Sequence, residues 1–325
     1  MKAQYIKQIS KEELVNTKFD LVITSSGYEE RSSYIANLIS QNARTRIVFA
    51  FTDYDNNKIR MRNDVVFESL NYTFFKADGS NSTIIKEIIE HYLSDSSIEK
   101  ILIDYSSMTR IWYSSIINFF RNLEIDNRVL HVYYAYSCAK FDNRDEKNVE
   151  EKDRENVNEK DEFRLSHFDP IEDYFYLTPS DVPTALITCL GAEPNNTYGL
   201  KEYFDAELLY LFYSEKNEFA EFIKEKNKAL LDETLEKYKI PYYIDDIIFT
   251  KTILFDLCKT LMKDHRVIIA PCGPKVFTLI SLLVASELEE IDVWRISRKP
   301  FKPENQTVNA SQKVITCNIC YKKLT

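Results

Sequence analysis

Residues 100–120 read KILIDYSSMTRIWYSSIINFF, and this stretch decides the fold class of the chain. It begins with the apolar run ILI at residues 101–103, which is typical of a strand buried on both faces. A polar turn follows over residues 104–110, and the apolar residues after it recur at close to the 3.6-residue period of a helix. Strand, polar turn and helix make up half of an open α/β unit. Such sheets bind ligands where the turns leave the carboxyl ends of the strands.

The same alternation continues on both sides of this stretch. Strands alternating with helices of roughly 8–15 residues predict a parallel, doubly wound sheet. Residues 1–18 are interpreted as a polar lead-in with a short helical turn at residues 11–14. The expected strands cover residues 19–24, 46–51, 72–75, 101–103 and 129–136 in the first half, and 184–189, 207–213, 242–248, 266–270 and 291–296 in the second, with a last edge strand over 313–319.

The two halves share one order of elements. The first has the strand LVIT followed by Gly27 and, later, ILID before an apolar helix; the second has LITC followed by Gly191 and, later, VIIA before an apolar helix. From Ile23 to Ile103 is 80 residues, and from Ile187 to Ile269 is 82. We therefore predict two tandem Rossmann-like, doubly wound parallel-sheet domains related by a pseudo-repeat. The alternative is an accidental match, because all α/β domains alternate in this way.

A highly charged segment lies between the two halves of the chain and is interpreted as the domain boundary. Residues 141–164 are almost entirely charged or amide residues and cannot bury enough apolar surface to offset their ordering entropy. The expected division is a domain over residues 1–140, a charged insertion or linker over 141–167, and a domain over 168–325, since 325 residues exceed one ordinary core.

Bulk composition excludes several classes of protein. A formal net charge of −9 argues against a general nucleic-acid binder. No run of 18 apolar residues and no signal peptide is present, so we expect a cytoplasmic protein without a membrane span. The six cysteines are thinly spread, which is typical of a reducing compartment.

The first half offers charged residues at its strand ends. Glu29 and Arg31 follow the turn glycine Gly27; the glutamate is either a first-turn carboxylate stabilised by the helix dipole or a base or ribose ligand, with the arginine on a phosphate. Asp53 ends the second strand, where α/β nucleotide sites place a ribose-binding acid, although a turn aspartate explains it equally well. Asp104 could orient Arg110, bind a hydroxyl or act as a catalytic carboxylate.

In the second half, the loop PCGPK at residues 271–275 is the short motif most indicative of a ligand site. Lys275 stands at the start of a helix, where the dipole disfavours a cation, so a bound anion would explain it; a surface lysine is the alternative. No GxGxxG fingerprint occurs, so ordinary dinucleotide binding is not indicated. The four histidines lack metal-ligand spacing, and Cys317 and Cys320 form a lone CxxC. We therefore predict neither a metal nor a cofactor.

These considerations give one set of candidate residues. The expected ligand-binding residues are Gly27, Tyr28, Arg31, Asp53, Ser106, Arg110, Gly191, Gly273 and Lys275, and the candidate catalytic carboxylates are Glu29 and Asp104.

The pairing of D-x-S-x-M-x-R with P-x-G-P-K, and the G-Y-E-E-R turn near the start, is similar to a group of bacterial two-lobed proteins. The residues that carry this similarity are Gly27 to Arg31, Asp104, Ser106, Arg110, Gly273, Pro274 and Lys275. The layout also resembles the Rossmann-like (CARF/SAVED-type) sensor domains of CRISPR and related antiviral systems, which bind cyclic oligonucleotides. Their G-T-K turn has a loose counterpart at residues 273–275. The resemblance implies a setting in bacterial antiviral defence.

Three functions follow as hypotheses. The first is a binding protein for a nucleotide or another phosphorylated ligand, acting as a sensor or effector in a defence system. The second is a nucleotide or nucleoside hydrolase that uses Glu29 or Asp104. The third is a scaffold for a partner protein of such a system, presenting aromatic surface and the charged 141–164 segment.

Overall fold

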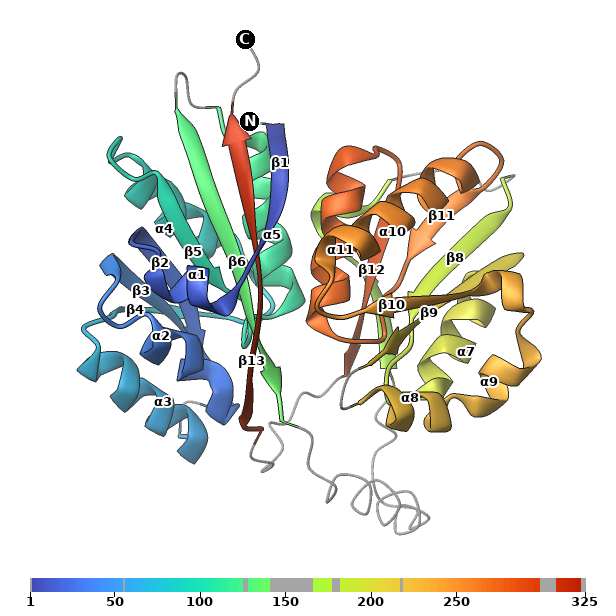
Figure 1. The fold of residues 1–325 in the computed structure, drawn as a ribbon, viewed down its shortest axis with the longest axis horizontal. Coiled ribbons are helices and arrows are strands. Elements are labelled where there is room, and N and C mark those ends of the chain that lie inside the picture. Colours follow the sequence, from blue (N-terminus) through green and yellow to red (C-terminus); the bar gives the residue numbers. More distant parts are fainter. Residues whose placement is uncertain are drawn as a thin grey trace.

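The computed structural model describes residues 2–54, 56–124, 128–140, 166–176, 182–216, 219–298 and 308–322. They form two lobes that lie side by side, each built on one twisted sheet (Figure 1). Most neighbouring strands are parallel and are connected through helices, so the predicted α/β class with two Rossmann-like units is confirmed. Most of the charged segment predicted at 141–167 lies outside the described residues.

The first lobe contains a seven-stranded sheet. Its strands, in their order across the sheet, are β1 (Lys2–Ile9), β13 (Ala310–Lys322), β6 (Val129–Ala139), β5 (Lys100–Asp104), β2 (Phe19–Ser26), β3 (Ala43–Phe51) and β4 (Thr73–Ala77). Its helical elements are α1 (Lys11–Asn16), η1 (Glu30–Ser33), α2 (Tyr34–Leu38), α3 (Lys58–Ser69), α4 (Thr83–Leu93) and α5 (Arg110–Asn122).

The second lobe contains a six-stranded sheet. Its strands are, in order, β10 (Lys239–Tyr243), β9 (Leu208–Glu215), β8 (Thr184–Cys189), β11 (Arg266–Ile269), β12 (Asp292–Arg298) and β7 (Ser166–Pro170). Its helical elements are η2 (Glu172–Tyr174), α7 (Pro194–Tyr203), α8 (Ala220–Lys226), α9 (Lys228–Glu233), η3 (Glu236–Tyr238), α10 (Ile247–Leu261) and α11 (Lys275–Glu287).

The internal repeat is present in the strand order and the register. The parallel strands run β4-β3-β2-β5-β6 in one lobe and β10-β9-β8-β11-β12 in the other, and each row continues into an antiparallel strand, β13 or β7. Ile23 pairs with Ile103, and Ile187 pairs with Ile269, so the two spacings counted in the sequence each join directly adjacent strands. The alternation of elements therefore reflects one topology used twice.

The ends of the chain differ from the predicted division. Residues 310–322 were expected to belong to the second domain, with an edge strand at 313–319, but β13 lies inside the first sheet, between β1 and β6. Residues 2–9, expected as a polar lead-in, form the edge strand β1. The physical reason is that β13 is buried from Ile315 to Tyr321, so its backbone needs a hydrogen-bonded strand on each side. The edge strand β1 supplies one of them and carries polar residues on its exposed face.

The two lobes share one hydrophobic core. On one face of the first sheet, α1, α2 and α3 cover residues such as Val22, Val48 and Leu102, whereas α4 and α5 cover the opposite face. That opposite face faces the second lobe, where α10 and α11 cover the second sheet and α11 packs against α5 (Figure 1). Helices α7, α8 and α9 cover the outer face of the second sheet. This packing brings the loops at one end of both sheets to the boundary between the lobes.

Candidate functional site

Asp104 holds the turn between β5 and α5. Its Oδ1 accepts hydrogen bonds from the backbone N–H and the hydroxyl of Ser106, at 3.0 and 2.5 Å, and Thr24 donates to Oδ2 at 3.4 Å. Burial raises the pKa of Asp104 to about 6, although the hydrogen bonds from Ser106 and the charges of Arg31 and Lys275 oppose the shift. The candidate carboxylate is enclosed, with 2% of its surface exposed, and its contacts fix the turn.

Arg31 ties the loop after β2 to the end of β6. Its Nε donates to Glu29 Oε2 at 2.6 Å, and its Nη1 donates to the Tyr136 hydroxyl at 3.0 Å and to the Ser137 carbonyl oxygen at 2.6 Å. Burial alone would raise the pKa of Glu29, but the charges of Arg31 and then of Lys275 hold it below its ordinary value. Arg31 therefore uses its guanidinium on groups of the protein itself.

Lys275 crosses from the second lobe to the first. It is the first residue of α11, and its Nζ donates to the carbonyl oxygens of Ser106 at 2.7 Å and of Met108 at 2.9 Å. Burial lowers the pKa of Lys275 to about 7; the nearby charge of Arg31 adds to the shift, and that of Glu29 opposes it. A lysine at a helix N-terminus is thus stabilised by carbonyl oxygens of the other lobe, with no bound anion needed to explain it.

Arg110 makes the opposite crossing. It is the first residue of α5, and its Nε donates to Thr278 Oγ1 of α11 at 3.4 Å. Its positive charge also lies close enough to Cys272 to oppose the rise in pKa that burial imposes on that thiol. The charges of Arg31 and Arg110 both act on the Lys275 ammonium, so the three predicted cations lie near one another. Their expected contact with a phosphate stays a prediction.

The predicted turn glycines permit close contact between neighbouring loops. A Cβ on Gly27 would lie 2.8 Å from Ser107 Cβ, and a Cβ on Gly191 would lie 2.2 Å from the carbonyl oxygen of Cys272. A Cβ on Gly273 would lie 2.5 Å from Cys189 Sγ. Ile23 and Ile187 hold equivalent positions in the first parallel strand of each lobe. Gly27 and Gly191 each lie four residues later, so these two glycines hold the same position in the repeat.

An inter-lobe pocket of about 470 Å³ opens at the carboxyl ends of β8, β9 and β11. The second lobe lines it with the loops after these strands and with α8, and the first lobe closes it with the ends of β6 and β13. The lining residues are Tyr136, Cys138, Ala139, Leu190, Gly191, Ala192, Ser214, Lys216, Phe219, Ile223, Ile244, Cys272, Gly273, Pro274, Ser311 and Lys313. Because β8 and β11 are the strands at which the strand order reverses, the pocket lies at a topological switch point, where open α/β sheets bind their ligands.

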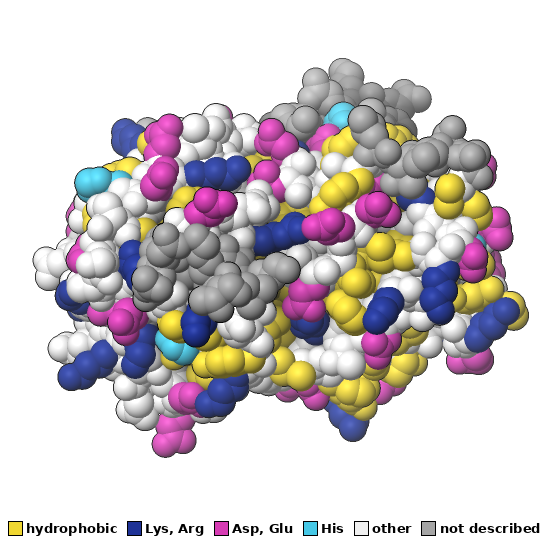
Figure 2. All heavy atoms as spheres, turned by 90° about the horizontal axis from the view of Figure 1, so that it is seen from above, with side chains coloured by type: hydrophobic (Ala, Val, Ile, Leu, Met, Phe, Trp, Pro, Cys, Tyr) yellow, Lys and Arg dark blue, Asp and Glu magenta, His cyan; other side chains and the backbone are white. Residues whose placement is uncertain are grey.

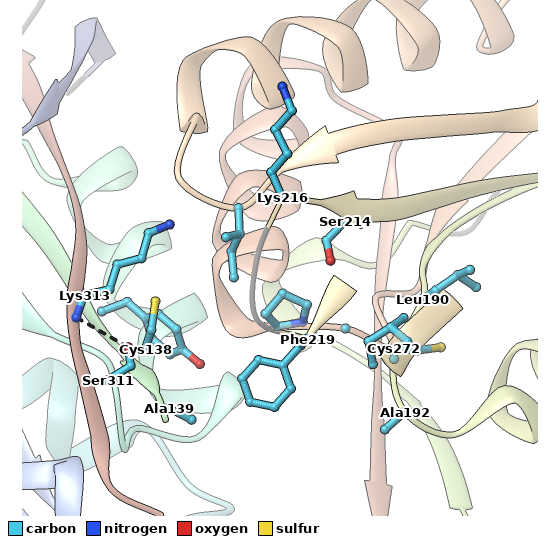
Figure 3. Close-up of a pocket in the computed structure, with 16 residues that line it drawn as sticks. Cys138, Ala139, Leu190, Ala192, Ser214, Lys216, Phe219, Cys272, Ser311 and Lys313 are labelled. Atoms are coloured by element: carbon cyan, nitrogen blue, oxygen red, sulfur yellow. Dashed lines mark hydrogen bonds between the residues drawn. The ribbon is translucent and has the colours of Figure 1, made fainter. Parts of the chain in front are cut away.

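Two lysines line the inter-lobe pocket, one from each lobe (Figure 3). Lys313 comes from β13, and its Nζ forms an ion pair with Asp245 Oδ2 at 2.5 Å. Lys216 follows β9, and its Nζ lies 5.0 Å from the centre of the Tyr243 ring. Phe219 presents its ring to the same pocket from the second lobe. The pocket thus combines apolar walls with cationic groups at its edge.

The corresponding space in the first lobe is filled by side chains. Phe51 and Ser214 hold the same position in the repeat. Phe51 lies four residues after Ile47, the partner of Ile23. Ser214 lies four residues after Tyr210, the partner of Ile187. The Phe51 ring stacks on Trp112 with centroids 4.3 Å apart. A serine in place of the phenylalanine leaves the equivalent space open in the second lobe.

Other predicted residues lie apart from the inter-lobe pocket. Asp53 is exposed at the end of β3, and its carbonyl oxygen accepts a hydrogen bond from the Tyr28 hydroxyl. Of the predicted ligand-binding residues, Gly191 and Gly273 line the pocket. Gly27, Ser106 and the three cations lie in or against the neighbouring loops of the first lobe.

Two groups of residues near the site were not predicted from the sequence. Lys216 follows a strand that was correctly expected, and its place after that strand was the available signal; Lys313 carried none, because β13 was assigned to the other sheet. The second group, on α3, holds the loop after β2: Asn63 Nδ2 donates to the Gly27 carbonyl oxygen at 3.0 Å, and Ser26 donates to Asp64 Oδ1 at 2.6 Å.

The surface gives further information about the described residues. On the face shown in Figure 2, basic side chains are interspersed with acidic and hydrophobic ones. Among the described helices, none is both long and apolar enough to cross a bilayer. Within those same residues, histidine, cysteine and carboxylate side chains do not gather in groups of three or more that could hold a metal ion.

Comparison with known proteins found no family model and no curated protein that matches the chain.

Proposed function

We propose that this chain binds a nucleotide, or another phosphorylated small molecule of similar size, in the inter-lobe pocket. The observation that carries the proposal is the position of the pocket at the switch point of the second sheet, closed by the first lobe. Its volume of about 470 Å³ lies within the range of roughly 300–1,000 Å³ typical of small-molecule sites.

The lining suits a ligand with an apolar ring and an anionic group. Leu190, Phe219 and Ile223 offer an apolar and aromatic wall, which is the surface that a nucleobase prefers. Lys216 supplies positive charge at the edge, where a phosphate would keep part of its hydration, and Lys313 lines the first-lobe side while paired with Asp245. The ligand would contact both lobes at once.

Arg31, Arg110 and Lys275 have a supporting role in this proposal. Tyr136 lines the pocket, and its hydroxyl accepts a hydrogen bond from Arg31. Lys275 directly follows the pocket residue Pro274 and is bound to two carbonyl oxygens of the first lobe. Lys275 and Arg110 therefore hold the two lobes in the arrangement that forms the pocket, and Arg31 holds the first-lobe residue Tyr136 that lines it.

The other hypotheses stay predictions. Glu29 and Asp104 are both engaged by groups of the protein, and hydrolysis would require one of them to act on a ligand from that position. The setting in bacterial antiviral defence and the scaffold role likewise stay predictions from the sequence.

A pocket-blocking variant tests the proposal. Ala192 is exposed at the pocket edge, so Ala192→Phe adds bulk there without entering the core. Glu202→Phe, at an exposed position of α7 that does not line the pocket, is the matched control. With millimolar nucleotides, we expect at least one to raise the melting temperature of the wild type and of Glu202→Phe, and not that of Ala192→Phe. A panel that leaves the wild type unchanged, or that stabilises all three proteins equally, would exclude this pocket as the site.

A further inference from the structure

The second lobe has the strand order of nucleotide-binding sheets. Counted from its first parallel strand, β8, the order β10-β9-β8-β11-β12 is 3-2-1-4-5. In sheets of this order, the residue at the carboxyl end of the second strand reaches the sugar of a bound nucleotide. An acidic residue there accepts hydrogen bonds from a free ribose diol, whereas a basic residue accommodates a phosphate on the ribose.

In this chain the residue at that place is Lys216. Ser214 and Lys216 line the inter-lobe pocket, while Glu215, between them, lies 3.9 Å from Lys224 of α8. Strand alternation places Ser214 and Glu215 on opposite faces of β9, and Lys216 follows directly after the strand. The acid at the strand end therefore does not line the pocket, whereas the lysine lines it, with its ammonium extending away from Ser214 and Phe219 in the view of Figure 3.

Lys216 is also held in an unusual backbone conformation. Its φ is 54°, in the left-handed region that side chains other than glycine rarely adopt. No carboxylate of the described residues forms an ion pair with its Nζ, which lies over the Tyr243 ring. A flexible four-carbon stem lets the ammonium exchange that ring contact for a phosphate without a backbone movement.

The first helix of the lobe does not supply a phosphate site. Glu193 is the N-cap residue of α7, and its carboxylate accepts a hydrogen bond from Asn196 Nδ2 at 2.9 Å. Pro194 is the first residue of the helix, so an acidic side chain and a missing N–H stand at the helix end where a Rossmann sheet binds the 5′ pyrophosphate. The loop before it has the single glycine Gly191. Binding of a phosphate at the N-terminus of α7 is therefore disfavoured, and binding at the carboxyl end of β9 is favoured.

The first lobe shows the reverse arrangement. Six residues after Ile47 stands Asp53, and six residues after Tyr210 stands Lys216, so the two residues hold the same position in the repeat. The lobe with the acid has its space filled by Phe51, and the lobe with the open pocket has the lysine.

From this juxtaposition we infer that the inter-lobe pocket selects a nucleoside phosphorylated on its 2′ or 3′ oxygen, and that Lys216 is the specificity-determining residue. This inference rests on the proposed function. It predicts that the position of the phosphate on the ribose, and not the number of phosphates, decides affinity.

Isomeric nucleotides test it at constant composition. Dissociation constants for the 2′-, 3′- and 5′-monophosphates of each of the four common nucleosides are measured by calorimetry on the full chain. We expect the 2′ or 3′ isomer of at least one nucleoside to bind about tenfold more tightly than its 5′ isomer, as one charge-assisted contact provides. Lys216→Gln should remove that preference, and Lys259→Gln, at an exposed position of α10, should keep it.

The outcomes separate the two proposals. Equal or tighter binding of the 5′ isomers that Ala192→Phe abolishes would overturn the specificity and leave the binding function standing. A preference for the 2′ or 3′ isomers that survives Lys216→Gln would overturn the role of Lys216. No binding of any isomer would overturn both.

Discussion

Lys275 Nζ, in the second lobe, donates a hydrogen bond to the carbonyl oxygen of Ser106, in the first lobe, at 2.7 Å. The same ammonium donates to Met108, and the Arg110 side chain that begins α5 reaches back to Thr278. The first residue of each of the two helices at the boundary therefore contacts the other lobe. This reciprocal contact fixes the position of the loop that leads from the inter-lobe pocket to α11.

Replacing Lys275 should loosen this boundary. Lys275→Met leaves two carbonyl oxygens without their donor, and the expected loss in the free energy of unfolding is about 1–3 kcal/mol. Urea denaturation measures it, with Lys259→Met as the control for loss of a lysine from an exposed helix position. Equal stability of Lys275→Met and the wild type would show that the cross-lobe bonds contribute nothing net.

The lowered pKa of Lys275 predicts a dependence on pH. Because the folded-state pKa is about 7 and the unfolded value is the ordinary 10.5, the unfolded chain binds more protons between these values. Stability should therefore rise with pH above 7 and fall as pH drops through 7. Relative to Lys275→Met, the wild type should gain on the order of 1 kcal/mol between pH 7 and 9, since partial exposure of Lys275 reduces the full linkage value. A flat difference between the two proteins would contradict this.

Asp104 predicts the opposite slope at lower pH. Its folded-state pKa of about 6 exceeds the ordinary 3.8, so the folded chain binds more protons between these values. The stability contributed by the neutral carboxyl is complete below about pH 4 and is lost as pH rises through 6. Unfolding of the wild type and of Asp104→Asn, measured at pH 4.5 and 6.5, should show this slope in the wild type alone; the same slope in both would assign it to other groups.

The two pocket glycines should not tolerate a side chain. A Cβ on Gly191 would lie 2.2 Å from the Cys272 carbonyl oxygen, a backbone atom that cannot move aside without shifting the loop. Gly191→Ala should cost about 2 kcal/mol or more. Gly199→Ala is the matched control, because its Cβ would meet only the tip of the Phe168 ring, at 3.2 Å, in the middle of α7. Thermal unfolding that ranks Gly199→Ala below Gly191→Ala would contradict the steric argument.

Local patterns predicted the parts of the fold that local chemistry determines. The apolar strands and the polar turn at Asp104 follow from hydrophobic period and from side chains that hydrogen-bond their own backbone. The 80- and 82-residue spacings corresponded to the registered pairs Ile23 with Ile103 and Ile187 with Ile269. Position at the strand ends likewise drew attention to Arg31, Arg110 and Lys275, whose charges act on one another in the structure.

Long-range pairing could not be predicted in the same way. The pattern of β13 is compatible with either sheet, and only tertiary packing places it between β1 and β6. The inter-lobe pocket depends on that placement, because Ser311 and Lys313 close it. The hydrogen-bond partners of each cation could not be predicted either. Every residue has a backbone carbonyl oxygen, so no sequence pattern identifies the carbonyl groups of a distant loop that bind Lys275.

Calorimetric titration measures whether the inter-lobe pocket binds a phosphorylated small molecule. The nucleotide that most stabilises the wild type is titrated into the wild type, Ala192→Phe and Glu202→Phe. We expect saturable binding with one site per chain for the wild type and for Glu202→Phe, and no binding heat for Ala192→Phe. Binding to Ala192→Phe with unchanged affinity would contradict it.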